Sequence, residues 1–428
     1  SEGRSAYPND FRPSHTGAEL LGMLSEQLEP TSPDRSAGAP VCVAGRLMAY
    51  NRKGKVAFLR LRDRSASAVV ECRRMVDDKR EAAGMERRDN DASTFQVFFR
   101  RNEDEALFDA LFKSTSDDGV DRPPQIDIGD IVAAVGRPFR TRTGEPSLWA
   151  CALDEDDTPF EGLSSETPCV RILVKAIRPL PEKFHGLTDK ETRFRQRYVD
   201  LIANDQVRVI FEKRAGVVST LRRFFDQRGY LEVETPMMHS LVGGAAARPF
   251  STHHNALDIP LYLRIAPELY LKRLVVGGIE RVYEINRNFR NEGISQQHNP
   301  EFTMLEFYQS YATYQDLMVL LETLFEQLAV AVCGGAEIPY GSDENDAVQM
   351  ISMAAPFERV SVYEGIERWG GLSGAQLHDG SLLRARLAEL DVEISADAPI
   401  GKLQMELFEQ VAEPRGLGLE GILVVEQD

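Results

Sequence analysis

The residues best suited to chemistry lie in one stretch, residues 287–311, with the sequence RNFRNEGISQQHNPEFTMLEFYQSY. Arg290 offers a planar fork of donors that suits a phosphate oxygen, and Phe302 offers a flat face on which a base can stack. Glu306 lies among apolar residues, where a carboxylate stays charged at low cost only beside a cation such as a ligand ammonium. Together, these residue types could hold a nucleotide and an amine side by side.

We expect this stretch to form a strand, a loop and a returning strand. Because side chains alternate along a strand, one face of the first strand would carry a polar set: Glu284, Asn286, Asn288, Arg290 and Glu292. One face of the second would carry Phe302, Met304, Glu306 and Tyr308. Arg290 and Glu306 can then line one concave surface with Phe302 between them. A surface hairpin with ordinary salt bridges fits the same residues.

Length and composition indicate a globular protein with more than one domain. The chain has 428 residues, of which 43% are hydrophobic, so it can form two or three domains with separate cores. It has no window of about 18 uncharged apolar residues, which a membrane span requires. Its N-terminus lacks the basic and apolar regions of a signal peptide. We therefore expect a soluble, cytoplasmic protein with no membrane partner.

Cysteines and charges narrow the kinds of site. The five cysteines are scattered and form no CxxC pair, which argues against a disulfide framework or a zinc site, and no metal ligand is assigned. The net charge is −17, yet basic residues cluster in residues 45–64 and 171–197. Such clusters can contact the phosphates of a nucleic acid, although solvated strand and loop faces explain them equally well.

Changes in composition divide the chain into four parts. Residues 1–38 are polar and predict a flexible N-terminal extension with a helix near residues 18–27. Residues 39–153 contain short β-rich runs between turn signals, such as KVAFLRLRD, SAVVEC and FQVFF, which indicates a small β-barrel. Charged stretches within residues 73–124 look like surface insertions whose function the sequence does not indicate. Residues 154–182 read as a polar linker.

In the remaining part, residues 183–428, strands and helices alternate. Apolar residues at Ile210, Val217, Leu221 and Phe224 have the spacing of an amphipathic helix over residues 205–227. Further helices are expected at residues 314–332, 381–390 and 402–412, and YLEVETP is expected to be a strand.

Several long motifs resemble one enzyme family. FRNEGISQQHNPEFTMLEFY resembles the second signature motif of class II aminoacyl-tRNA synthetases, in the form found in lysyl-tRNA synthetases. GYLEVETPMM, residues 229–238, resembles the first motif, residues 243–278 the amino-acid-binding segment, and residues 183–204 the entry to the catalytic domain. The resemblance implies an α+β fold. It comprises an OB-fold β-barrel that binds the anticodon (residues 39–153) and a class II antiparallel sheet flanked by helices (residues 183–428).

The resemblance also implies a role for each matching residue at an ATP site. Arg290 would contact the α-phosphate as the catalytic residue, and Glu292 would receive the adenine amino group. His298 would face the terminal phosphates, Asn299 the adenine region, and Phe302 would stack on the adenine.

A lysine site and a tRNA site follow from the same resemblance. The substrate ammonium would lie against Glu306 and Tyr308, and the α-amino end would meet Gly244 and Glu268. Phe58 is a candidate platform for an anticodon base, with Arg46 nearby in sequence. A core position in the barrel fits Phe58 equally well.

The implied activity is ATP-dependent attachment of L-lysine to tRNA(Lys) through a lysyl-adenylate, with Mg²⁺ and in a homodimer. Because the family's catalytic domain continues beyond the point that matches Asp428, we expect the Mg²⁺ ligands and the third motif there. GLGLEGILVV, residues 416–425, is not that motif because Leu423 stands where its Arg should be.

Other functions are possible from the sequence. One alternative is a truncated relative that binds tRNA or a protein partner without aminoacylating. Another is a related enzyme that attaches an amino acid to a protein, which the OB-like part disfavours. Specificity for aspartate is disfavoured because Glu306 would repel its carboxylate.

Overall fold

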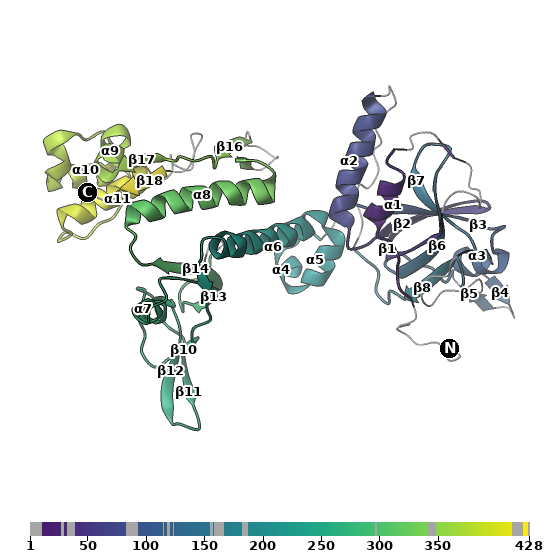
Figure 1. Cartoon of the computed structure of the whole chain (residues 1–428), viewed down its shortest axis with the longest axis horizontal. Coiled ribbons are helices and arrows are strands. Elements are labelled where there is room, and N and C mark those ends of the chain that lie inside the picture. Colours follow the sequence, from purple (N-terminus) through teal and green to yellow (C-terminus); the bar gives the residue numbers. More distant parts are fainter. Residues whose placement is uncertain are drawn as a thin grey trace. The chain divides into compact units, whose positions relative to one another are not determined.

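The computed structural model describes most of the chain, as two compact units, Ser1–Ile210 and Phe211–Asp428 (Figure 1). The described residues are 11–26, 30–31, 39–82, 93–113, 115–117, 120–122, 124–154, 157, 167–181, 187–295, 298–340, 348–412 and 423–426. No helix among them is long and apolar enough to cross a membrane. Both units combine helices and strands, which confirms the α+β class.

A six-stranded sheet, in the order β1-β2-β3-β7-β6-β8, forms the centre of the first unit. Its strands are β1 (Val41–Lys53), β2 (Val56–Arg62), β3 (Phe95–Arg100), β6 (Ile131–Arg140), β7 (Pro146–Ala150) and β8 (Val170–Val174). A short hairpin, β4 (Thr115–Asp117) and β5 (Val120–Arg122), stands apart from the sheet. Strand β1 also pairs with β6, so the pairings β1-β2-β3-β7-β6 return to β1.

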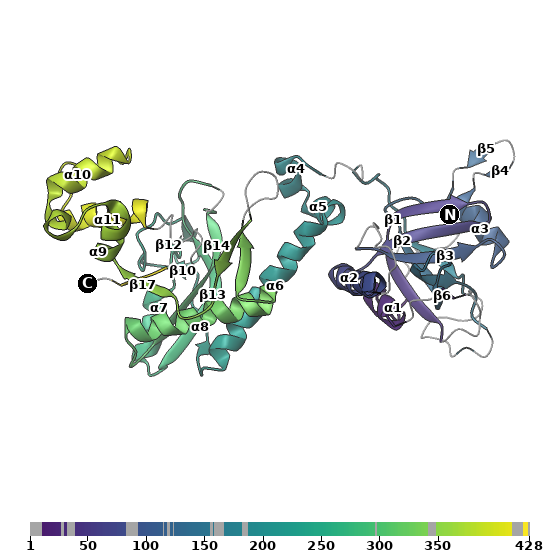
Figure 2. The same ribbon diagram turned by 90° about the horizontal axis from the view of Figure 1, so that it is seen from above.

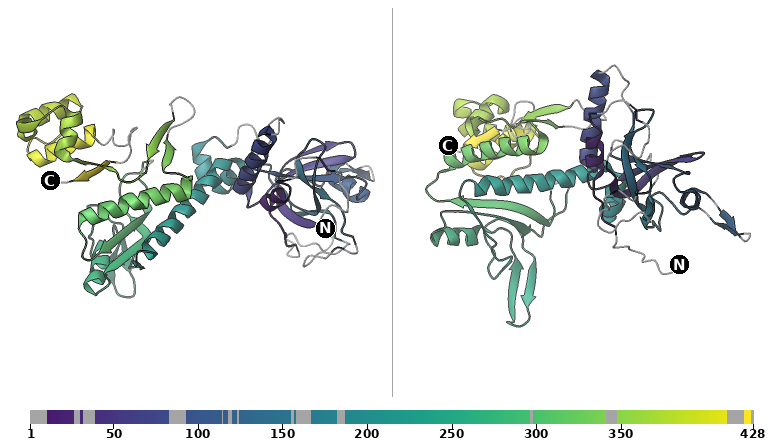
Figure 3. Two further views of the ribbon diagram at one scale, coloured as in Figure 1. Left: turned by 45° about the horizontal axis from the view of Figure 1, so that its top comes forward. Right: turned by 45° about the vertical axis from the view of Figure 1, so that its right-hand side comes forward.

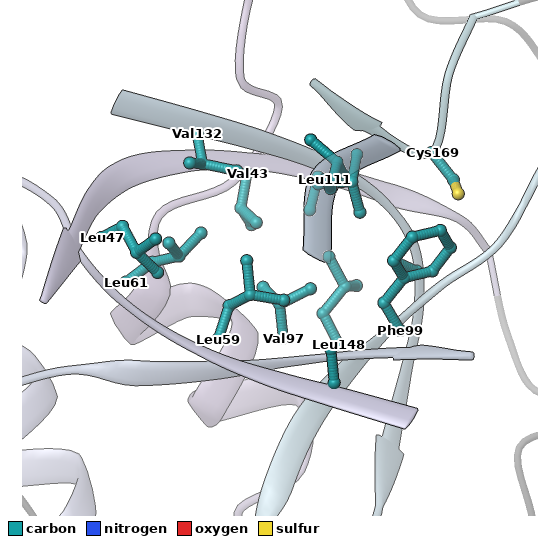
Figure 4. Packing of buried hydrophobic residues seen from close by; sticks show 14 of the residues in the cluster. Val43, Leu47, Leu59, Leu61, Val97, Phe99, Leu111, Val132, Leu148 and Cys169 are labelled. Atoms are coloured by element: carbon teal, nitrogen blue, oxygen red, sulfur yellow. The ribbon is translucent and has the colours of Figure 1, made fainter. Parts of the chain in front are cut away.

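Alternation along the strands creates the core of this unit. On β2, Ala57, Leu59 and Leu61 are buried, whereas Phe58 and Arg60 between them are only partly buried. The inward residues of the other strands, together with helix α3 (Glu105–Phe112), complete one hydrophobic cluster, part of which is drawn in Figure 4. This alternation agrees with the expected strands, and it places the other side chains of each strand on a second, outer face of the sheet.

One expected strand of the first unit was wrong. SAVVEC is not a strand but the start of helix α2 (Ala66–Ala82), because the buried residues Ala66, Val69, Arg73 and Val76 recur at helical spacing. Strand β8 lies within the expected linker and pairs with β6.

The helix that was expected near residues 18–27 is present and packs on the sheet. Leu20 of helix α1 (Gly17–Met23) is fully buried in the sheet's core, so residues 11–26 belong to the unit. Residues 1–10 and 32–38 lie outside the described residues. Helices α4 (Lys190–Arg195) and α5 (Arg197–Ala203) follow later in this unit.

The second unit is organised around one long antiparallel hairpin, β13 (Arg281–Phe289) and β14 (Glu301–Gln309). Helices α6 (Asp205–Asp226) and α8 (Tyr314–Cys333) lie on the same side of it (Figures 2 and 3). Phe224 and Phe225 of α6, Tyr283 of β13 and Leu324 of α8 form the core between these elements. The hairpin therefore has one apolar face covered by helices, and its opposite face is the polar one.

Smaller elements complete this unit. Strand β9 (Leu231–Glu232) runs parallel to β13, and a second small sheet has the order β10-β12-β11. These strands are β10 (Met238–His239), β11 (Ser251–His254) and β12 (Ile259–Leu263), and helix α7 (Glu268–Val276) contacts both strands of the hairpin. YLEVETP thus forms a much shorter strand than expected.

A helical cluster with its own small core follows the hairpin and α8. It contains α9 (Val362–Gly365), the π-helical turn η1 (Ile366–Gly370), the 3-10 turn η2 (Gly374–His378), α10 (Gly380–Glu389) and α11 (Ile400–Val411). The flanking strands are β15 (Glu337–Tyr340), β16 (Gln349–Ser352), β17 (Glu358–Ser361) and β18 (Leu423–Glu426). The expected helices at 381–390 and 402–412 are confirmed.

We predict that Phe225→Ala lowers the free energy of unfolding of the second unit by about 3–5 kcal/mol, because it leaves a cavity. The Phe225 ring is 0% exposed and contacts Tyr230, Tyr283 and Phe307. Urea unfolding followed by circular dichroism measures the change. The control is Phe211→Ala on the same helix, where the side chain is 51% exposed and the expected change is below about 0.5 kcal/mol. Equal losses in the two variants would contradict this packing.

Candidate functional site

A buried ion pair underlies the polar face of the hairpin. The Arg264 guanidinium donates from Nη1 to Glu284 Oε1 at 2.8 Å, and both side chains are at most 1% exposed. Arg264 also donates from Nε to Arg287 O at 2.9 Å and from Nη1 to Thr235 Oγ1 at 2.9 Å. Thr235 Oγ1 donates to Glu284 Oε2 at 2.6 Å. These bonds join the segment before Pro236, the end of β12 and the strand β13.

The register of the hairpin confirms the expected sharing of faces. Glu284 is directly opposite Glu306, and Asn288 is directly opposite Phe302. Since directly opposed residues in an antiparallel pair point to the same side, Glu284, Phe302 and Glu306 lie on the face that α6 and α8 leave uncovered. Arg290 follows the last residue of β13, and its guanidinium lies over the Phe302 ring of that face. The expected concave surface therefore has a structural basis.

Glu306 and Tyr308 form a carboxylate–phenol pair on β14. Tyr308 Oη donates to Glu306 Oε1 at 2.8 Å. Burial raises the pKa of Glu306, and the nearby Glu268 and Glu284 carboxylates raise it further. Burial and the bond to Glu306 raise the pKa of Tyr308 as well. A carboxylate in this setting gains from a cation, since a positive charge would offset both burial and repulsion.

Glu268, at the start of α7, lies beside this pair. It forms an ion pair with Lys272 one turn later on α7, and Lys272 Nζ lies 5.9 Å from the centroid of the Tyr308 ring. Gly244 approaches from the other side with φ of +90°, and a Cβ there would lie 3.0 Å from Glu268 Cβ. Only glycine fits this position without strain. Lys272 thus lies between Glu268 and the Tyr308 ring, and Gly244 packs against Glu268.

Arg290 and Phe302 form the other end of the same face. The Arg290 guanidinium carbon lies 5.2 Å from the centroid of the Phe302 ring. Arg290 Nε, Arg264 Nη2 and both amide atoms of Asn288 are buried without a hydrogen-bond partner. Because buried polar atoms normally have partners, these atoms can bind a water molecule or a ligand.

The remaining predicted residues of the hairpin lie at its loop end. Glu292, His298 and Asn299 are exposed. His298 is hydrogen-bonded through Nδ1 to Ser295 Oγ at 2.9 Å, and Asn299 Nδ2 donates to Glu301 O at 2.6 Å. The structure does not bring these three side chains into the polar face.

A separate pocket of about 470 Å³ lies on the outer face of the first unit's sheet. Phe58 lines it; its side chain is partly buried, and its ring packs against that of Phe98 with the centroids 5.2 Å apart. The other lining residues are Ala49, Tyr50, Asn51, Lys53, Arg60, Gln96, Thr141, Thr143 and Glu145. An aromatic face beside amide, carboxylate and guanidinium groups suits a single-stranded nucleobase. Arg46 does not line this pocket; it donates from Nη1 to Gly129 O at 2.7 Å and lines a different cavity.

Sequence reasoning missed several residues that shape both sites. Arg264 gave a signal, because a charged residue inside the apolar run LYLRIAP is unexpected unless it has a buried partner. Gln96 and Glu145 gave none, since Gln96 is an isolated polar residue within β3 and Glu145 is one directly before β7. Their placement depends on the pairing of β3 with β7, which are far apart in sequence.

Comparison with known proteins finds matches over most of the chain. Residues 189–411 match the family model described as tRNA synthetases class II (D, K and N). A lysine–tRNA ligase from Cronobacter sakazakii is 41% identical over 414 residues, which cover 95% of this chain and 69% of that protein. A lysine–tRNA ligase from Carboxydothermus hydrogenoformans is 41% identical over 412 residues, covering 96% of this chain and 70% of that protein.

The raised pKa of Glu306 predicts a pH-dependent stability. The pKa of Glu306 in the folded protein lies above its ordinary value of 4.5. The charged carboxylate therefore destabilises the folded state at pH values above the pKa values of both the folded and the unfolded state. This destabilisation disappears below pH 4.5, where the carboxyl group is protonated in both states. Glu306→Gln should therefore raise the melting temperature near pH 8 and have little effect near pH 4. Thermal unfolding of the ligand-free protein measures both. Glu301→Gln, an exposed position on the same strand, is the control and should show no such difference. A melting temperature for Glu306→Gln below that of the wild type at the higher pH would refute the prediction.

Proposed function

Because the chain belongs to the class II lysyl-tRNA synthetase family, we propose that it attaches lysine to tRNA(Lys), with ATP as the second substrate and a lysyl-adenylate as the intermediate. The observation that carries this proposal is the shared strand face, on which the Glu306–Tyr308 pair and the Arg290–Phe302 pair lie together.

The lysine side chain would bind at Glu306 and Tyr308. Its ammonium would offset the burial and the carboxylate repulsion that raise the pKa of Glu306. The position of Lys272, bonded to Glu268 and near the Tyr308 ring, supports this assignment because this part of the site already accommodates an ammonium. The side chain of aspartate would be repelled there. Glu268 and the Gly244 backbone would bind the α-amino end.

ATP would bind at Phe302 and Arg290. In the ligand-free structure the Arg290 guanidinium lies over the Phe302 ring, where adenine would stack. Binding would place adenine on the ring and move the guanidinium to the α-phosphate, and the unpartnered Arg290 Nε supports such a rearrangement. Glu292, His298 and Asn299, on the exposed loop, would then close on the adenine and the terminal phosphates.

The reaction has two steps. The lysine carboxylate attacks the α-phosphorus in line, the bond to the leaving pyrophosphate breaks, and lysyl-adenylate forms. A terminal ribose hydroxyl of tRNA then attacks the lysyl carbonyl and AMP leaves. Arg290 would stabilise charge that develops on the α-phosphate, and the site would act by positioning.

Mg²⁺ is a typical partner of this chemistry in the family. Within the part of the chain that the structure describes, no group of three or more His, Cys, Asp or Glu side chains could hold a metal ion. Mg²⁺ that accompanies a nucleotide binds mainly to substrate phosphates and to one or two carboxylates, and neither step above is routed through it.

The first unit would bind the tRNA. We propose that residues 39–153 form an OB-fold barrel for the anticodon and that the protein acts as a homodimer. Residues 154–182, which include strand β8 of the same sheet, would connect the barrel to a catalytic domain of residues 183–428. The return of the strand pairings to β1 and the pocket at Phe58 support the barrel assignment.

The direct test is lysine-dependent exchange of labelled pyrophosphate into ATP, followed by charging of a tRNA(Lys) transcript. We expect exchange with lysine and none with aspartate or asparagine. Exchange with aspartate alone would overturn the lysine assignment. Absence of exchange with every amino acid would favour the alternative, a relative that binds tRNA or a protein partner without aminoacylating.

Glu306→Gln should separate the two substrates. Loss of a partly buried charge–charge contact costs about 2 kcal/mol or more, so KM for lysine should rise by about 30-fold or more, while KM for ATP should change little. Initial rates of pyrophosphate exchange measure both constants. Equal increases in KM for lysine and KM for ATP would contradict the assignment of Glu306 to the lysine site.

A further inference from the structure

Helix α2 is not required by the topology of the sheet that contains it. Strands β2 and β3 are antiparallel neighbours, and such strands can be joined by a tight turn. Instead the chain between Arg62 and Phe95 includes a helix of 17 residues, Ala66–Ala82. Helix α2 is therefore longer than a connection between β2 and β3 requires, and its contacts indicate its role.

Arg73 is the residue through which α2 reaches the strands. It occupies a position on the buried face of the helix and is only 9% exposed. Its Nε and Nη2 donate to Thr94 O at 3.0 and 2.8 Å, just before β3. Its Nη2 also lies 2.9 Å from Glu145 Oε1, just before β7. A buried arginine with three such contacts fixes the positions of its partners.

Glu145 belongs to the nucleobase pocket defined above by Phe58 and its neighbours. The carboxylate is buried, and Arg60 of β2, another lining residue, donates to the same oxygen at 2.7 Å. The two guanidinium groups outweigh burial and hold the pKa of Glu145 down, at about 2. Glu145 is therefore ionised at any physiological pH.

We propose that Arg73 is a positioning residue for this pocket: from helix α2 it holds Glu145 as an ionised hydrogen-bond acceptor, which favours a base whose edge presents an N–H donor. This inference rests on the proposed function, in which the pocket binds an anticodon base. An ionised carboxylate only accepts hydrogen bonds. Uracil presents N3–H at the edge where cytosine presents a lone pair, so the pocket should prefer uracil.

Arg73 and Arg60 contribute differently to this preference. Arg60 lines the pocket and can contact the base itself, whereas Arg73 does not line it and acts only through Glu145 and Thr94. Two arginines around one carboxylate also leave a net positive charge, which suits the phosphates next to a bound base. Arg73 thus sets the position and charge of the acceptor without touching RNA.

The test is binding of RNA hairpins to the full chain by fluorescence anisotropy at fixed salt. The hairpins carry the anticodon stem-loop with a UUU anticodon and three derivatives with single U→C changes. For the wild-type protein we expect at least one change to weaken binding by about tenfold or more, as for other base contacts. Arg73→Met should reduce that discrimination to about twofold or less, and Arg73→Lys, which keeps the charge but not the fork, should restore part of it.

The matched control is Arg74→Met. Arg74 is the next residue on the same helix, and its side chain is exposed. This variant should discriminate as the wild type does. If Arg73→Met also discriminates as the wild type does, the inference is overturned.

A double-substitution cycle separates positioning from a general loss of stability. Glu145→Gln should abolish the discrimination. The variant with both Arg73→Met and Glu145→Gln should bind the hairpins no more weakly than Glu145→Gln alone, because Arg73 acts through Glu145. If Arg73→Met alone fails to fold, Arg73→Lys decides the question, because discrimination equal to that of the wild type in this variant would overturn the inference. Additive losses would refute the positioning role.

The outcomes distinguish this inference from the proposed function. If the wild type and Arg73→Met discriminate equally among the hairpins, only the proposed role of Arg73 is excluded. If the wild type binds all four hairpins equally, both the assignment of the pocket to an anticodon base and the inference are excluded. Lysine-dependent pyrophosphate exchange requires no tRNA and tests the ligase activity separately.

Discussion

The buried Arg264–Glu284 ion pair is the interaction on which the polar face of the hairpin depends. It lies beneath that face and joins three segments that are separate in sequence, through Thr235, Arg264 and β13. Removing either partner would leave an uncompensated buried charge, which typically costs about 3–5 kcal/mol. Its hydrogen bonds also fix β13 laterally, so the side chains that alternate along that strand have defined positions before any ligand binds.

The two ends of this face differ in how complete they are without a ligand. At the Glu306 end, the carboxylates already have a phenol and a lysine ammonium as neighbours. At the Arg290 end, several buried polar atoms have no partner, and the guanidinium rests on an aromatic ring. In the proposed function, the first end is therefore preorganised for a cation, whereas the second would rearrange to receive a nucleotide.

Sequence patterns predicted the parts of the fold that depend on local periodicity. The two faces of the hairpin follow from the period of two, and helices α6 and α8 follow from the period of about 3.6. Helix α2 was missed because SAVVEC is rich in β-branched residues, and only the burial of Arg73 and Val76 further along reveals the helical face. The lining of the pocket at Phe58 could be predicted only in part. The basic surroundings of Phe58 singled it out in the sequence, but Glu145 lies beside it through long-range strand pairing that no local pattern encodes.

In the proposed function, Lys272 competes with amine ligands at the carboxylate end of the hairpin. Its ammonium is tethered to the same helix as Glu268 and is about half exposed, so it acts as a competitor that is always present at high local concentration. A pair of this kind, four residues apart on a helix, contributes only about 0.3–0.5 kcal/mol, and a ligand with several simultaneous contacts displaces it easily. A simple amine that offers charge alone exchanges one ammonium for another and gains almost nothing. Among ammonium ligands, the tethered side chain would therefore favour those that make several contacts over simple amines.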